Sequence, residues 1–69
     1  MKLTKTTYPG WNRYPVYEVY NRDDYIEIDR WMAQNECDSF LLSSGGTEHY
    51  IFQVRNNHEW FILRWSYEL

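Results

Sequence analysis

Three side chains of this 69-residue chain belong to the types that most often do chemistry in proteins: Cys37, His49 and His58. Metal sites gather three or four Cys, His or carboxylate ligands at short, recognisable spacings, and these residues follow none of them. The chain also has no Ser, His and acid set and no glycine-rich phosphate loop, because Gly45-Gly46 is better explained as a turn. We therefore expect no metal, no cofactor and no enzymatic activity.

The elements that would position these side chains begin with a β-hairpin, predicted over residues 47–66 and turning at Asn56-Asn57. An Asn-Asn pair tolerates positive φ and suits a two-residue type I′ turn, and both flanks are rich in aromatic and β-branched residues. In this register His49 and His58 would lie roughly 20 Å apart along the strands. The two histidines are therefore not expected to share a site.

Upstream of the hairpin, the sequence predicts a strand over 14–20, a helix from Asp23 to about Gln34 and a strand over 38–44. Asn21 is a good N-cap, and acidic residues follow it where the helix dipole favours them. Apolar residues recur at helical spacing on one side of the helix: Tyr25, Ile28 and Met32, with Trp31 at the border. Gly45-Gly46 predicts a tight turn into the hairpin.

The resulting fold class is α+β: a small βαβββ domain with a four-stranded mixed sheet and one amphipathic helix on one face. The strand order is either 1-2-3-4 or, if the first strand lies beside the last, 2-3-4-1. Residues 1–13 contain threonines, a Pro9-Gly10 turn signal and two large aromatics, which indicates an N-terminal arm rather than a strand of the sheet. Residues 14–69 are expected to form the single domain.

In this hairpin register the sheet has two apolar faces but only one helix to cover them. The face toward the helix would carry Tyr50, Phe52, Phe61, Leu63 and Trp65. The opposite face, which is the candidate binding surface, would carry Phe40, Leu42, Ile51, Trp60 and Ile62, edged by His49, Gln53, Arg55, His58 and Arg64. A domain of this size buries only about 60% of its unfolded surface, so an apolar patch of that extent predicts a partner or a cover.

The leading functional hypothesis is a non-enzymatic interaction module that forms a homodimer, through the face opposite the helix or through an edge strand. A fold-back of the arm, with Tyr8, Trp11 and Tyr14, would instead cover that face and leave a monomer. Single-stranded nucleic acid or another ligand could bind the aromatic and Arg side chains of the face, although the acidic chain disfavours nucleic acid. Another alternative is an acidic protein that inhibits or regulates a second protein.

Charge and composition bear on the compartment and on folding. The net charge of −3 is segregated, with the acidic residues concentrated on and around the predicted helix. An aromatic content of 20% is far above that of disordered segments and indicates a folded chain. Cys37 is the only cysteine, so no internal disulfide can form. Without a signal-like leader or a long apolar run, the expectation is a cytoplasmic protein that is not in a membrane.

Overall fold

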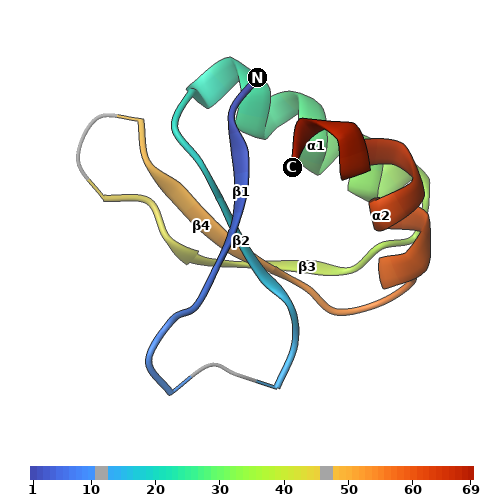
Figure 1. The fold of residues 1–69 in the computed structure, drawn as a ribbon, viewed down its shortest axis with the longest axis horizontal. Coiled ribbons are helices and arrows are strands. Elements are labelled where there is room, and N and C mark those ends of the chain that lie inside the picture. The colour runs from blue at the N-terminus through green and yellow to red at the C-terminus, as the bar shows by residue number, and fades with distance from the viewer. Residues whose placement is uncertain (11–12, 46–47) are drawn as a thin grey trace.

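The computed structural model describes residues 1–10, 13–45 and 48–69. Trp11 of the predicted arm, Gly46 of the predicted turn and Thr47 at the start of the predicted hairpin lie outside these residues. The described elements are β1 (Leu3–Thr6), β2 (Val16–Val19), α1 (Arg22–Gln34), β3 (Ser39–Ser43), β4 (Tyr50–Val54), α2 (His58–Trp65) and a short 3-10 turn, η1 (Ser66–Glu68). The four strands form one sheet in the order β1-β2-β4-β3 (Figure 1).

The α+β class and the four-stranded sheet are confirmed, as are three of the predicted strands and the first helix. Helix α1 begins where the capping signal predicted, since the side-chain oxygen of Asn21 accepts a 3.1 Å hydrogen bond from the backbone N–H of Asp24. Ile28 and Met32 are buried on its inner side, and Tyr25 and Trp31 pack at the border of the core. Local signals were sufficient for this helix.

The predicted fourth strand was wrong, because residues 58–65 form helix α2. Asn57 does adopt the predicted left-handed conformation, at φ 52°. A type I′ turn needs positive φ at both central residues, but Asn56 is not among the described residues with positive φ. The single left-handed residue therefore leads the chain into a helix, whose first turn is closed by the carbonyl of Asn57 accepting from the N–H of Trp60 at 3.0 Å.

The place beside β4 that was assigned to residues 60–65 is occupied by β2, with Tyr17 opposite Phe52. Residues 3–6 of the predicted arm form β1, which pairs with β2 at the sheet edge. The sheet is thus antiparallel throughout rather than mixed, and neither predicted strand order is correct. Strands β2 and β3 do run in the same direction, as predicted, but β4 separates them.

Both helices lie on one side of the sheet (Figure 1). Tyr25 of α1 and Phe61 of α2 each pack against Phe52, with ring centroids 5.8 Å and 6.3 Å from it. The width of the sheet explains why two helices are needed. Four strands about 4.8 Å apart place the outer strands about 14 Å from each other, whereas one helix is about 10 Å across. A single helix leaves part of that face in water, and α2 covers it.

The core lies between the sheet and the two helices. Tyr17, Phe52 and Phe61 are each 0% exposed, and Trp65 is 1% exposed. The ring of Tyr17 lies 4.8 Å from that of Phe61, centroid to centroid, which ties β2 to α2. Aromatic pairs at such separations contribute about 0.5–1.5 kcal/mol beyond the burial of their area. A cluster of aromatic rings therefore joins the sheet to α2 within the core.

Candidate functional site

The face of the sheet opposite the helices, hereafter the open face, is formed by side chains that alternate with the core residues. In and beside β4 these are His49, Ile51, Gln53 and Arg55, while Tyr50, Phe52 and Val54 point to the helices. Phe40 of β3 pairs with Gln53 and therefore shares this face. The structure thus brings together Phe40, Ile51, His49 and Arg55 from the predicted surface.

The other members of the predicted surface lie elsewhere. Trp60, Ile62 and Arg64 belong to α2, on the opposite side of the sheet. Ile62 packs against the core, and Trp60 is 57% exposed. Leu42 lies at the irregularity of β3, between the paired residues Leu41 and Ser43, and is half-buried. The predicted surface is therefore not one continuous patch, because a helix holds the residues that were assigned to a strand.

Guanidinium groups and aromatic rings alternate on the open face. The guanidinium carbon of Arg55 lies 4.4 Å from the ring centroid of Phe40 and 5.6 Å from that of Tyr14. Arg13 lies over the same Tyr14 ring at 5.8 Å. The order Arg13, Tyr14, Arg55, Phe40 is called the cation–aromatic ladder below. It spans from the segment before β2 to the edge strand β3.

The ladder explains why Gln53 is only 1% exposed on a face that carries no helix. Arg55 Nε donates a 3.1 Å hydrogen bond to Gln53 Oε1, so the buried amide has a partner. Tyr14 also contacts Arg55 from the segment before β2. The ladder is therefore a cover over part of the open face as well as a polar surface.

A shallow hollow of about 290 Å³ adjoins the ladder where β1 leads toward β2. Its lining residues are Lys5, Thr6, Thr7, Arg13, Tyr14, Pro15 and Val16. No carboxylate contributes to this lining, and two of the residues are cationic. In the part of the chain that the structure describes, neither Lys5, Arg13 nor Arg55 is in ion-pair contact with an acidic side chain. The positive charge here is not neutralised locally.

The far end of the open face has a different character. Nε2 of His49 lies 2.8 Å from a carboxylate oxygen of Glu18, and the His49 ring stacks on Tyr20 with centroids 4.5 Å apart. The Glu18 carboxylate can accept a hydrogen bond from the His49 imidazole, and the Tyr20 ring packs parallel to the imidazole. His49, Glu18 and Tyr20 therefore form a small cluster of interacting side chains at this end of the open face. His58 lies on the other side of the sheet, so the two histidines do not share a site.

The two edges of the sheet differ in composition. Edge strand β3 consists of Ser, Phe, Leu, Leu and Ser, with no charged residue. Phe40 and Leu41, which point to opposite faces, are 42% and 41% exposed. Edge strand β1 contains Lys5 and follows Lys2. Lysine is one of the residues with which natural proteins prevent edge pairing, and β3 is the edge without a charged residue.

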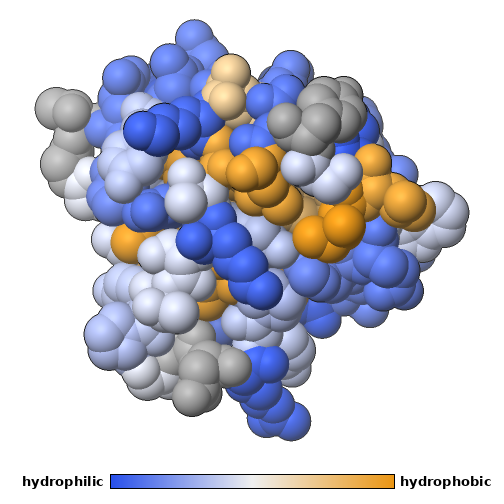
Figure 2. All heavy atoms as spheres, in the orientation of Figure 1, coloured by the Kyte–Doolittle hydropathy of each residue, from blue (hydrophilic) through white to orange (hydrophobic). Residues whose placement is uncertain are grey.

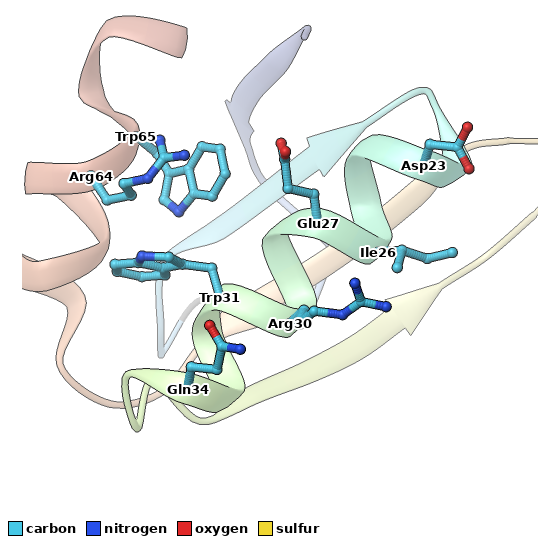
Figure 3. Close-up of a pocket in the computed structure, with 8 residues that line it drawn as sticks. All are labelled: Asp23, Ile26, Glu27, Arg30, Trp31, Gln34, Arg64 and Trp65. Atoms are coloured by element: carbon cyan, nitrogen blue, oxygen red, sulfur yellow. The ribbon is translucent and has the colours of Figure 1, made fainter.

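A second hollow, of about 340 Å³, lies between α1 and α2 (Figure 3). Trp31 and Trp65 meet edge-on at 6.0 Å in it, and the Arg64 guanidinium carbon lies 3.9 Å from the Trp65 ring centroid. Nε1 of Trp65 is fully buried and out of reach of a ligand in this cleft. The rim carries two carboxylates and two guanidinium groups, from Asp23, Glu27, Arg30 and Arg64. Its charges balance and favour no ligand of either sign.

Apolar side chains also reach the surface over α2 and the C-terminal end, as Figure 2 shows. Leu63 is 71% exposed and Leu69 is 49% exposed. Isolated exposed leucines are common on soluble domains and need no special explanation. In contrast to β3, these residues offer no unpaired strand edge.

Cys37 is 2% exposed, and its Sγ lies 3.5 Å from the carbonyl oxygen of Asn57, to which the thiol can donate. Burial raises the pKa of this thiol, and the nearby carboxylates of Asp38 and Glu59 raise it further. A thiolate is the reactive form of cysteine, so Cys37 is built as a small core residue. No cluster of three or more His, Cys, Asp or Glu side chains that could hold a metal occurs among the described residues.

Comparisons add no relative: no family model matches the chain, and no curated protein or solved structure is significantly similar to it. Neither helix in the described ranges is long and apolar enough to cross a membrane. Sequence reasoning did not include Lys5, Arg13 and Tyr14 in the candidate surface. Their signal was the excess of positive charge in residues 1–14, which becomes informative once β1 and β2 are known to pair.

Proposed function

We propose that this chain is a non-enzymatic interaction module that forms a two-fold homodimer through edge strand β3. The observation that carries the proposal is the combination of an uncharged edge and two large exposed side chains, Phe40 and Leu41, one on each face of the sheet. A strand edge presents unpaired N–H and C=O groups, and a second chain can satisfy them by pairing. Because β1 contains Lys5 and follows Lys2, whereas β3 has no charged residue, we infer that β3 is the edge that pairs.

A second copy is the occupant that β3 suits best. Antiparallel pairing of β3 with its own copy is isologous, so each chain supplies the same residues and the assembly closes after two copies. The segment Ser39–Ser43 contains no charge that would repel its counterpart. The irregularity between Leu41 and Ser43 leaves residues 39–41 as the regular part of the edge with which a second copy would pair.

Dimerisation would also increase the stability of this 69-residue chain. Domains of this size have a thin stability margin and often rely on disulfides, metals or oligomerisation. Because the chain has a single cysteine, it cannot form an internal disulfide. A reduced, buried Cys37 fits a reducing compartment, so we place the protein in the cytoplasm as part of this proposal.

Size-exclusion chromatography with light scattering, from about 5 to 200 µM protein, tests the dimer. We expect a dimer for the wild type and a monomer for both Leu41→Lys and Leu41→Glu, because either charge is buried without a partner on pairing. Leu63→Lys is the matched control: it places the same charge on an exposed leucine of α2 and should leave the dimer intact. Circular dichroism establishes that each variant is folded.

Two results would contradict the proposal. The first is a wild-type monomer at the highest concentration. The second is a dimer that Leu63→Lys disrupts and Leu41→Lys does not, which would place the contact on α2. Either result would concern only the contact between two copies and would leave the fold of the single chain unchanged.

A further inference from the structure

The cation–aromatic ladder is more than a cover for Gln53, because it places two guanidinium groups on one ring. Arg13 and Arg55 lie 5.8 Å and 5.6 Å from the centroid of Tyr14, so the ring is within cation–π range of both. The two positive charges around this ring repel each other, and a nearby anion would offset that repulsion. No acidic side chain of the described residues is in ion-pair contact with either.

The hollow beside the ladder adds polar groups to this surface. Lys5 lines the adjoining hollow of about 290 Å³ together with Thr6 and Thr7, whose hydroxyl groups can donate hydrogen bonds. Asp38 is the nearest acidic residue along β3, and its backbone carbonyl accepts from the N–H of Arg55 at 2.6 Å. Its carboxylate does not form an ion pair with Arg55. Lys5 pairs with Tyr17 and so points to the helix side of the sheet, which leaves Arg13 and Arg55 as two cations close together on the open face in a chain whose net charge is −3.

We infer that the cation–aromatic ladder and the adjoining hollow form a binding surface for single-stranded nucleic acid. Such ligands combine phosphates with flat bases, and proteins read them with basic grooves and stacking platforms. Phe40, at 42% exposed, can stack a base at the β3 end. Arg13 and Arg55 supply guanidinium groups for the phosphates.

The position of the ladder also separates this surface from the acidic one. Asp23, Glu27 and their neighbours lie on α1, on the other side of the sheet. A strand bound along the open face would therefore be shielded from them by the sheet. Arg13, Tyr14 and Arg55 lie outside β3 and do not depend on the proposed dimer, whereas Phe40 belongs to β3. Pairing through β3 would bring the Phe40 ends of two ladders together on the same face of a continuous sheet.

The test is fluorescence anisotropy with a labelled oligothymidylate of about ten nucleotides, at low salt. We expect wild-type binding whose logarithm falls with the logarithm of salt concentration with a slope of about −1.4, since single strands give about −0.7 for each of two phosphate contacts. Arg13→Gln and Arg55→Gln should each weaken binding by roughly tenfold and make the slope shallower. Arg64→Gln is the matched control: it removes the same charge from α2 and should bind as the wild type.

Two further measurements distinguish a nucleic-acid site from a general polyanion site. Phe40→Leu keeps an apolar side chain but removes the ring, and should weaken binding roughly tenfold because base stacking is lost. Inorganic polyphosphate of matched charge should compete poorly. Absence of wild-type binding, an equal effect of Arg64→Gln, or unchanged binding by Phe40→Leu with full competition by polyphosphate would each overturn the inference. Circular dichroism of every variant ensures that lost binding is not lost folding.

Discussion

The hydroxyl of Tyr17 lies 2.6 Å from Nε2 of His58 and joins the middle of the sheet to the first turn of α2. Tyr17 is fully buried, and burial raises the pKa of its hydroxyl, so the group stays protonated and can donate to an unprotonated Nε2 of His58. The His58 ring also stacks on Phe61 one turn later, with centroids 6.2 Å apart. These two contacts fasten the helix that the sequence pattern did not predict.

The pair makes stability depend on pH. Burial lowers the pKa of His58, and the nearby Lys5 lowers it further, while Glu59 acts in the opposite direction. The neutral imidazole is therefore favoured in the folded chain relative to the unfolded chain, where the pKa is about 6.5. Its contribution to stability is complete above about pH 6.5 and is lost as the pH falls toward the lowered pKa of the folded state. Urea unfolding at pH 7.5, 6.0 and 5.0 should show a falling midpoint.

Two histidine variants identify the residue responsible for this pH dependence. His58→Gln cannot titrate, so its unfolding midpoint should change much less between pH 7.5 and 5.0. His49→Gln removes the histidine on the open face and should retain the wild-type dependence. The interpretation fails if the wild type is equally stable at both pH values or if His58→Gln loses stability as the wild type does.

The helical state of residues 58–65 predicts unequal effects of truncating Phe61 and Leu63. Phe61 is 0% exposed and Leu63 is 71% exposed, as expected for two positions on different sides of a helix. Phe61→Ala should cost about 3–5 kcal/mol of unfolding free energy, whereas Leu63→Ala should change it by less than about 0.5 kcal/mol. Urea unfolding in the cold measures both. Similar losses would instead favour a strand, in which both side chains point to one face.

The buried position of Cys37 predicts a slow thiol. Its raised pKa and its exposure of only 2% both disfavour the reactive thiolate. Ellman's reagent at pH 8 should react with native protein far more slowly than with protein in guanidinium chloride. In a Cys37→Ser background, Ser44→Cys places a thiol at an exposed position and should react without denaturant. Comparable rates for native Cys37 and Ser44→Cys would show that residue 37 is accessible.

Part of the candidate surface follows from short-range pattern alone. Side chains alternate along a strand, so His49, Ile51 and Arg55 share a face once residues 50–54 are known to be a strand. Arg13 and Tyr14 could not be added in this way, because they reach Arg55 only through the pairing of β2 with β4. The same pattern wrongly assigns Trp60 and Arg64 to this face, because it does not show that residues 58–65 form a helix rather than a strand.

The sequence by itself determined the elements whose signals are local. The Asn21 cap and the spacing of Ile28 and Met32 specify α1. β-branched and aromatic runs specify β2 and β4, and the apolar run of residues 40–42 specifies β3. Asn57 likewise takes the left-handed conformation that its residue type allows. Each of these outcomes depends on residues within a few positions of one another.

Only the tertiary structure decided the state of residues 58–65 and of residues 3–6. The run from Trp60 to Trp65 is apolar enough for a buried strand, and it also places Phe61, Ile62 and Trp65 at helical spacing, so local preference does not separate the two states. The competition is settled elsewhere in the chain. Strand β2, supported at its outer edge by β1, takes the place beside β4. The helix side of a four-stranded sheet is wider than α1, and residues 58–65 bury most apolar surface by covering it as a helix.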